Sequence, residues 1–405
     1  MLSRHEDVIA ALLDHDTYSS VNGVFPTPPD APFLESFLPM MITMDPPRHD
    51  QLRGGLVSKA FTPPRRIVAL ETGIDQLAAS LVERLTSSGS EGRSDFVADL
   101  AGILPAVVIA DLLGGIPRED RQQFRQWSST LIQSNPARGE VAEGLAAAAA
   151  VYAYFADFLA DRRKAPRDDL MSALVAAEID GQRLSDDELL GFCLLLLIAG
   201  HETTTNLLAN AAVVLAGHPP RSRHRLAADP TLIGQTVEEL LRYDSPVQGL
   251  SRVLTTDVTL HGGATMSQGD SVLLLFGSAN RDERVFARPD VFDIDRKPEH
   301  QVAFGRGYPL LSGSCARPFR GSNCVGRIVV TIAGLGSRCR LSRASSFGAD
   351  SRIPVAAHHV AGELATLRLG AFLGRVVAGF DPVAGSLPLV RWAARKSSTI
   401  CVQSS

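Results

Sequence analysis

A long helical pattern at residues 186–215 constrains the fold more than any other feature of the chain. It opens at residues 185–188, whose Ser-Asp-Asp-Glu sequence is a helix-start signal, and it includes an apolar run at residues 192–199. That run is much shorter than the roughly 20 apolar residues of a membrane-spanning helix. We therefore expect a long helix in a soluble, mainly helical protein.

A polar motif, Ala-Gly-His-Glu-Thr-Thr-Thr at residues 199–205, interrupts the apolar pattern. Glycine and threonine weaken a helix, and threonine hydroxyls can bond back to carbonyls of the preceding turn and bend it. The motif is open to two interpretations. It is a buried helix segment with satisfied polar groups, or a functional bend at which Gly200, lacking a Cβ, lets a flat ligand approach. The other motifs of the chain favour the second interpretation.

The patterns before residue 308 predict one mainly α-helical domain with small β-sheets. Apolar residues recur at helical spacing in several further stretches. These stretches are residues 68–86, 95–114, 141–163, 168–178 and 231–243. Alternating apolar residues between positions 253 and 275, with Gly-Gly at residues 262–263, predict short strands and a hairpin.

The composition excludes several classes of protein. Of the 405 residues, 45% are hydrophobic and 21% are charged, which is ordinary for a soluble globular protein. The five cysteines, an odd number without metal-finger spacing, indicate neither a disulfide framework nor a zinc site. No charged-then-apolar signal pattern stands at the N-terminus. We expect a cytoplasmic protein that has no membrane partner.

Residues 308–405 differ in charge from the rest of the chain. They hold 12 basic and 3 acidic residues, whereas residues 1–307 hold 28 basic and 41 acidic ones. Four of the five cysteines lie in this tail, and its apolar residues follow no sustained helical period. A basic segment can bind nucleic acid, but these charges are scattered and not interleaved with aromatic residues. We expect no nucleic-acid partner and assign no structure or function to the tail.

Three motifs of the chain together resemble the cytochrome P450 family of haem-thiolate monooxygenases. The motif at residues 199–205 resembles the family's oxygen-activating segment. Glu239 and Arg242, about forty residues later, resemble its buried Glu-Arg pair, and the Phe-Gly-Arg-Gly sequence at residues 304–307 resembles the start of its cysteine loop. The resemblance implies a P450-like haem-binding fold for residues 1–307 and an aberrant C-terminal part.

The loop that should supply the iron ligand departs from the family pattern. That loop usually reads Phe-Gly-x-Gly-x-His-x-Cys-x-Gly, and its thiolate favours O–O cleavage. Here Leu311 stands at the cysteine position and Pro309 at the histidine position. Cys315 is the nearest candidate substitute, but it lies four residues beyond the expected place. The metal ligand is therefore unknown.

We hypothesise that a reading-frame change near Gly307 causes the departure. If residues 308–315 are back-translated and read one base later, the permitted codons include Ile-His-Phe-Cys-Leu-Gly-Ala. The new cysteine arises from the Leu311 codon and the next base. We expect residues 308–405 to lie out of the family's frame. We also expect the N-terminus to be truncated, because residues 4–8 resemble a segment that family members reach only after a leading helix and strands.

The resemblance implies roles for individual residues. Glu202 and Thr203 are the implied catalytic residues, an acid and an alcohol that relay protons during oxygen activation. Haem carries two propionates, so its site needs cationic groups from separate elements, and small or apolar groups lie next to the ring. The implied cofactor contacts are His49, Arg53, Ala199, Gly200, Arg252, His300, Phe304 and Gly305.

Glu239 and Arg242 are implied to be structural. On one helical face such a pair is most often an exposed contact worth under about 1 kcal/mol. If the pair is buried, removal of one partner should lower the free energy of unfolding by roughly 3–5 kcal/mol. The Pro- and Asp-rich residues 280–296 resemble the family's meander, which would brace the pair from the surface.

The implied function is insertion of one oxygen atom from O2 into an apolar small molecule. Electrons would come from NAD(P)H through a ferredoxin and ferredoxin-reductase type of partner. Residues 21–39 and 247–250 occupy places that line family substrate pockets, and they suggest a medium-sized apolar substrate. The alternative function is an inactive remnant without the axial cysteine, which binds haem or apolar ligands weakly.

Overall fold

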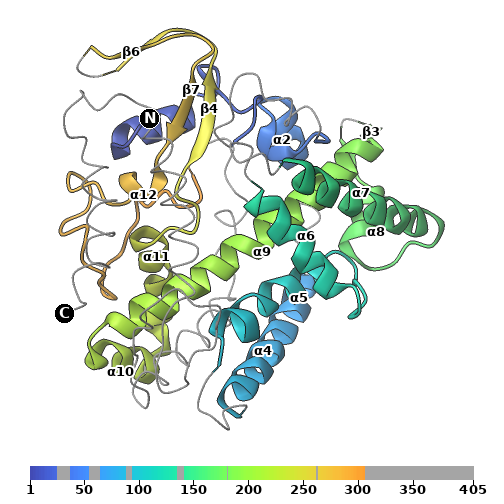
Figure 1. Cartoon of the computed structure of the whole chain (residues 1–405), viewed down its shortest axis with the longest axis horizontal. Helices are drawn as coiled ribbons and strands as arrows, with labels where there is room; N and C mark the ends of the chain where they lie inside the picture. The colour runs from blue at the N-terminus through green and yellow to red at the C-terminus, as the bar shows by residue number, and fades with distance from the viewer. Residues whose placement is uncertain are drawn as a thin grey trace.

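The computed structural model describes residues 1–24, 37–53, 64–87, 94–134, 141–179, 181–260 and 263–305. Helices dominate this described part, and its strands form small antiparallel sheets (Figure 1). The mainly α-helical architecture predicted from the sequence is confirmed. Residues 306–405, with Leu311 and Cys315, lie outside the described residues.

Helix α9 (Asp186–Gly217) runs through the middle of the fold, and several of the other helices pack against it (Figure 1). A capping box fixes its start, because the Glu188 backbone N–H donates to the Ser185 hydroxyl and the Ser185 backbone N–H donates to the Glu188 carboxylate. Leu189, Cys193 and Leu194 are fully buried in the main apolar core. The predicted long core helix is thus confirmed.

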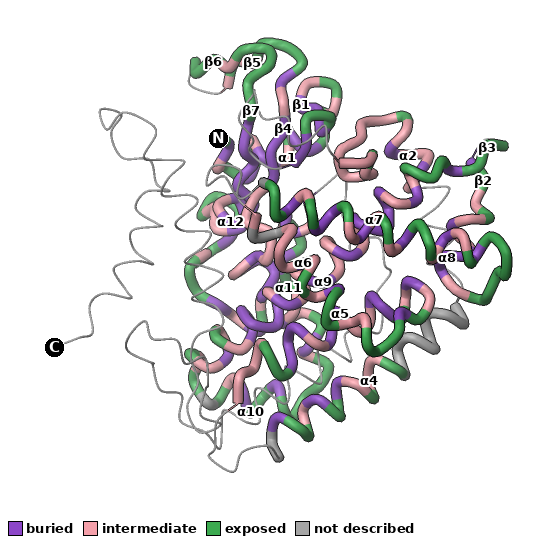
Figure 2. Tube along the Cα trace, turned by 45° about the vertical axis from the view of Figure 1, so that its right-hand side comes forward, coloured by how far each residue is buried: buried purple, intermediate pink, exposed green. Residues whose placement is uncertain are grey.

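The described residues before α9 form several helical elements, some of which contribute to that core and others to smaller apolar clusters. They are α1 (His5–Leu13), η2 (Met41–Thr43), α2 (Arg48–Leu52), α4 (Pro64–Ser87), η4 (Val97–Ala101), α5 (Ile103–Leu112), α6 (Arg121–Gln133), α7 (Val141–Lys164) and α8 (Leu170–Val175). Those after it are α10 (Pro220–Ala228), η6 (Pro230–Leu232), α11 (Ile233–Tyr243) and α12 (Phe276–Ala279). Buried residues follow the inward faces of the outer helices, as the tube in Figure 2 shows.

The main sheet joins distant parts of the sequence. Strand β4 (Leu250–Leu254) lies between β1 (Tyr18–Ser19) and β7 (Ser271–Leu274), antiparallel to both. Leu2 adds a parallel bridge to Leu274. The hairpin of β5 (Val258–Thr259) and β6 (Thr265–Met266) projects from this sheet, as the alternation in residues 253–275 predicts.

Several sequence-based boundaries were wrong. The stretch 95–114 is not one helix, because the π-helical turn η4 ends at Gly102 before α5 begins. The stretch 168–178 contains only α8, and residue 178 already starts a hairpin of β2 (Glu178–Ile179) and β3 (Gln182–Arg183). Helices α1, α6 and α10 were not predicted at all.

Two helices are long and apolar enough to cross a membrane by length and composition alone. They are Ala142–Lys164 and Asp186–Gly217. They pack against each other within the helical body, and half of the apolar window of the second is buried there. The first also buries Arg162, whose Nε lies 2.6 Å from the Asp169 carboxylate. Both helices are therefore accounted for by the core of the fold.

Candidate functional site

Two of the hydroxyl groups in the polar motif of α9 are hydrogen-bonded within the helix. Thr203 Oγ1 donates to the Ala199 carbonyl at 2.7 Å, and Thr205 Oγ1 donates to the His201 carbonyl at 2.9 Å. Both bonds reach back one turn, as predicted for threonine in a helix. Glu202 is half-buried beside Thr203. An acid and an alcohol, both partly buried, thus lie next to each other on α9.

His201 connects this motif to two other elements, which the sequence did not predict. Its Nε2 lies 3.2 Å from the Gly102 carbonyl and its Nδ1 lies 3.0 Å from Ser128 Oγ. A carbonyl only accepts, so Nε2 carries the proton and Nδ1 accepts from the serine. Burial lowers the pKa of His201, and the nearby Arg125 lowers it further. His201 is therefore a neutral side chain that fixes α9 against η4 and α6.

Gly200 has a packing role that differs from the expected one. A Cβ at this position would lie 2.3 Å from Ile109 Cδ1 of α5. The missing side chain therefore makes room for Ile109 in the structure. Contact of Gly200 and Ala199 with a cofactor through their remaining surface stays a prediction.

Arg252 in β4 and the segment around α2 lie close together, through Asp45. The Asp45 carboxylate accepts from the Ser19 hydroxyl and from the Ser20 backbone N–H, and the latter distance is 2.9 Å. Ser19 pairs with Val253, the neighbour of Arg252. The register of β1 and β4 therefore places the Arg252 end of the sheet beside the residues that lead into α2.

His49 and Arg53 stand in this neighbourhood. The His49 backbone N–H donates to the Asp45 carbonyl at 3.1 Å, and the His49 ring is buried with Nδ1 3.1 Å from the Asp50 carboxylate. Arg53 follows the last residue of α2 and is half-buried. The structure thus brings three of the four predicted cationic groups to one region.

Arg252 is a buried cation that lacks a full set of partners. Its side chain is 2% exposed, and Nη1 donates to the Ser251 carbonyl at 2.7 Å. Within the described part of the chain, Arg252 Nη2 and the nearby Ser20 Oγ are buried without a hydrogen-bond partner. Burial lowers the pKa of Arg252, and the Asp45 carboxylate partly offsets this effect. The resulting pKa is about 10. A buried guanidinium of this kind suits an external anion, so a haem propionate fits the group.

The fourth predicted cation, His300, lies in the segment that leads towards residues 304–307. Its side chain is exposed, and its backbone carbonyl accepts from His5 Nε2 at 2.7 Å. The chain continues from there to Phe304, which is half-buried, and to Gly305, which is buried with a positive φ of 77°. That φ favours glycine. Contact of these residues with a cofactor stays a prediction.

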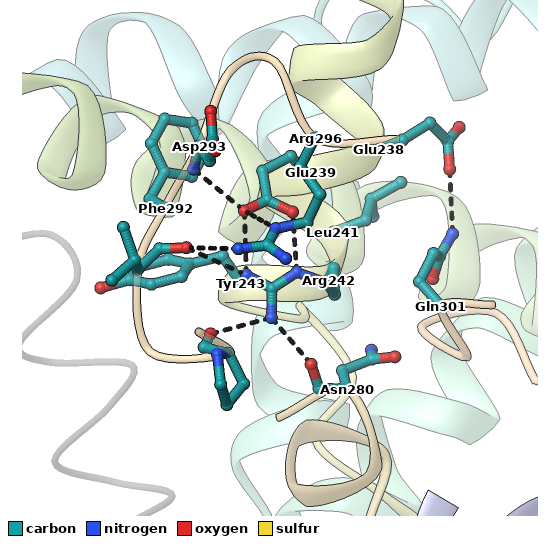
Figure 3. A network of polar contacts seen from close by, with 12 residues as sticks. Glu238, Glu239, Leu241, Arg242, Tyr243, Asn280, Phe292, Asp293, Arg296 and Gln301 are labelled. Atoms are coloured by element: carbon teal, nitrogen blue, oxygen red, sulfur yellow. Dashed lines mark hydrogen bonds and ion pairs between the residues drawn. The ribbon is translucent and has the colours of Figure 1, made fainter. Parts of the chain in front are cut away.

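The Glu239–Arg242 pair is buried and fully bonded, as predicted (Figure 3). Both side chains have 0% exposure, and Arg242 Nε lies 2.7 Å from Glu239 Oε2. Arg242 Nη1 donates to the carbonyls of Asn280 and Pro289, at 2.8 and 2.9 Å. Arg296 Nε donates to Glu239 at 3.1 Å. The meander therefore braces the pair, which is structural.

Comparisons with known proteins agree with this arrangement. A family model described as cytochrome P450 matches residues 1–224 and 222–308. The vitamin D(3) 25-hydroxylase of Pseudonocardia autotrophica is 39% identical over 330 residues, which cover 81% of this chain and 79% of that protein. The steroid C26-monooxygenase of Mycobacterium tuberculosis strain H37Rv is 40% identical over 318 residues, 77% of this chain and 75% of that protein.

Solved structures are similar over the same region. Substrate-free CYP109E1 of Bacillus megaterium matches with a TM-score of 0.71 and 32% identity, covering 88% of this chain and 92% of that one. CYP109Q5 of Chondromyces apiculatus matches with a TM-score of 0.68 and 35% identity, covering 83% and 81%. The family uses haem as its cofactor and takes electrons from NAD(P)H through partner proteins. The chain belongs to the cytochrome P450 family of haem monooxygenases.

Proposed function

We propose that residues 1–307 form the haem- and substrate-binding part of a monooxygenase that acts on an apolar small molecule. The observation that carries this proposal is the buried guanidinium of Arg252, whose Nη2 has no hydrogen-bond partner within the described residues. Without an anionic ligand, this desolvated charge would lower the stability of the folded chain. One propionate supplies the missing charge and acceptor.

Each site residue of this chain has a proposed role in binding haem or in moving protons. His49, Arg53, Arg252 and His300 hold the two propionates, and Ala199, Gly200, Phe304 and Gly305 lie against the ring. When bound, haem supplies the site for reductive activation of O2. Thr203 and Glu202 move protons towards the site of O2 activation. The Thr203 hydroxyl donates its proton to the Ala199 carbonyl, and its lone pairs can still accept a hydrogen bond from a proton donor.

The substrate is proposed to be apolar and of about steroid size. Met40, Met41 and Met44 are partly buried and pack against the same core as Leu196 and Ile198 of α9. Methionine adapts to irregular apolar shapes, which suits a binding surface. The names of two relatives point to sterol-like substrates, and CYP109E1 has been solved with testosterone. Residues 25–36 of the expected substrate loop lie outside the described residues.

The remaining partners follow from the proposed chemistry. Two electrons for each turnover require a redox protein, and we propose a ferredoxin served by an NAD(P)H-dependent reductase. A cytoplasmic location fits such a partner.

We also propose that residues 308–405 are out of the family's reading frame. The match to the family model ends at residue 308, where the basic character begins. The codons that the genetic code permits for residues 308–315, read one base later, include a cysteine at the position of Leu311. Resequencing the gene tests this: a single-base offset before residue 311 supports it, and an intact frame with no such alternative reading contradicts it.

A second candidate function is a haem- or ligand-binding remnant without monooxygenase activity. Leu311 favours it, because leucine cannot ligate iron. The alternative ligand Cys315 lies four residues too late and outside the described residues.

The spectrum of the reduced, carbon monoxide-treated protein separates the two candidates. The full chain and a chain with the restored frame are each purified with haem present. We expect a thiolate-type red shift of the Soret band from the restored chain and none from the chain as it stands. Haem uptake by neither protein would overturn the proposed function for residues 1–307. A variant carrying only Leu311→Cys should not regain the thiolate spectrum, because the surrounding loop residues remain different.

A further inference from the structure

The segment at residues 300–305, which leads into the expected ligand loop, is held by side chains from three separate elements. His5 Nε2 of α1 bonds to the His300 carbonyl at 2.7 Å. Gln301 Nε2 donates to Glu238 of α11 at 3.0 Å. The backbone N–H of Val302 donates to Asn280 Oδ1 at 2.7 Å. Of these contacts, the one with Asn280 is fully buried, since both residues are 0% exposed.

Asn280 also connects this segment to the Glu239–Arg242 pair. Its own carbonyl accepts from Arg242 Nη1 at 2.8 Å (Figure 3). Its Nδ2 donates to Ser245 Oγ at 2.9 Å, and Ser245 Oγ donates to the Leu241 carbonyl at 2.7 Å. Asn280 therefore uses its main chain and both ends of its amide to join α11 to Val302.

The charged pair itself stops short of the segment. Within the described residues, the hydrogen bonds of Arg242 end on Glu239 and on the carbonyls of residues 280, 289 and 291. Those of Glu239 come from Arg242, Arg296 and the Asp293 backbone. The rigidity of the pair thus reaches Val302 through Asn280.

The chemistry of these contacts selects asparagine. The Val302 N–H can only donate, so the amide oxygen must face it, which fixes the orientation of the whole amide. An aspartate keeps the acceptor but loses the donor towards Ser245. A leucine of similar volume keeps neither, and it leaves the Val302 N–H buried and unbonded.

We propose that Asn280 is a positioning residue that transmits the rigidity of the Glu239–Arg242 pair to the backbone at Val302, and so presets the entry of the ligand loop. The relevance of that entry rests on the proposed haem function. The contact itself does not, so it can be tested on the chain without haem.

Amide hydrogen exchange at Val302, measured in the full chain without haem, tests the proposal. We expect Asn280→Leu to lower the protection of the Val302 amide roughly tenfold, since one buried hydrogen bond is lost. Asn280→Asp keeps the acceptor but adds a buried carboxylate, so it should lower the protection of the Val302 amide less than Asn280→Leu does. The matched control is Asn210→Leu, which removes another buried amide, bonded to the Asp244 carbonyl at 3.0 Å, and should leave Val302 unchanged.

Two results would overturn the proposal. One is unchanged Val302 protection in Asn280→Leu. The other is an equal loss in Asn280→Asp and Asn280→Leu, which would make Asn280 a packing residue. Should Asn280→Leu fail to fold, Ser245→Ala replaces it: freeing the amide nitrogen should lower Val302 protection about two- to threefold, and no change there would equally contradict the proposal. All these measurements are made without haem, so their results can be interpreted even if the chain does not bind haem.

Discussion

Two buried arginines, Arg242 and Arg252, have opposite surroundings. Arg242 is 0% exposed, and a carboxylate and several carbonyls occupy its donors. Arg252 is 2% exposed, and its Nη2 finds no acceptor within the described residues. A buried charge that the chain itself compensates holds the fold together, whereas one that it leaves uncompensated points to a charge that comes from outside.

The largest expected effect is on the compensated arginine. Arg242→Met should lower the free energy of unfolding by roughly 3–5 kcal/mol, because it leaves the Glu239 carboxylate buried with less than its full set of partners. Urea unfolding of the chain without haem measures this. A loss below about 1 kcal/mol would mean that Arg296 alone compensates Glu239, and the contrast between the two arginines would then weaken.

The uncompensated arginine should behave in the opposite way. Arg252→Met should leave the unfolding free energy of the chain without haem unchanged, or raise it by up to about 3 kcal/mol, because it removes a desolvated cation. The pKa of Arg252 is lowered from 12.5 to about 10, so the penalty is constant below pH 10 and is relieved only as pH rises above it. Urea unfolding at neutral pH checks the sign. A loss as large as that of Arg242→Met would make Arg252 a structural residue.

His201 supplies a weaker, pH-dependent test on a third buried titratable side chain. Its pKa is lowered by burial from 6.5, so the unfolded chain binds the proton more readily. The stability due to neutral His201 is present above pH 6.5 and is lost as pH falls towards the lowered pKa. His201→Gln should therefore flatten the pH dependence of unfolding below pH 6.5. An unchanged slope would show that other groups cause the acid sensitivity.

The smallest effect should come from an exposed ion pair. Arg183 Nε lies 3.3 Å from Glu178 Oε1 on a surface hairpin, with 72% and 53% of the two side chains exposed. Solvent screens such a pair, so Arg183→Ala should change the unfolding free energy by less than about 1 kcal/mol. Arg183→Ala is therefore the exposed control for the substitutions of the two buried arginines. A larger loss would mean that charge deletion in this chain is costly regardless of burial.

The sequence predicted what local patterns encode. The helical period of residues 186–215, the back-bonding threonines and the Glu239–Arg242 pair on one helical face all depend on neighbours within four residues. The two buried arginines could not be told apart in this way, because the difference lies in partners such as the carbonyl of residue 280 and the carboxylate of residue 45, which are distant in the sequence.

The missed features have the same cause. The expected helix at 95–114 is interrupted at Gly102, whose carbonyl accepts from His201, 99 positions further along the chain. Asn280 belongs to the segment that was expected to brace the pair from the surface, but it is fully buried and its amide bonds to Ser245 and Val302. In both cases a long-range hydrogen bond gives a residue a role that its neighbours in the sequence do not reveal.

Haem titration of the full chain and of Arg252→Leu, followed by the Soret band, tests the central claim most directly. The account predicts that the parent takes up haem and that Arg252→Leu binds it at least tenfold more weakly, with no loss of unfolding free energy in the absence of haem, because one charge-assisted hydrogen bond is removed. Equal haem affinities of the two proteins would contradict it.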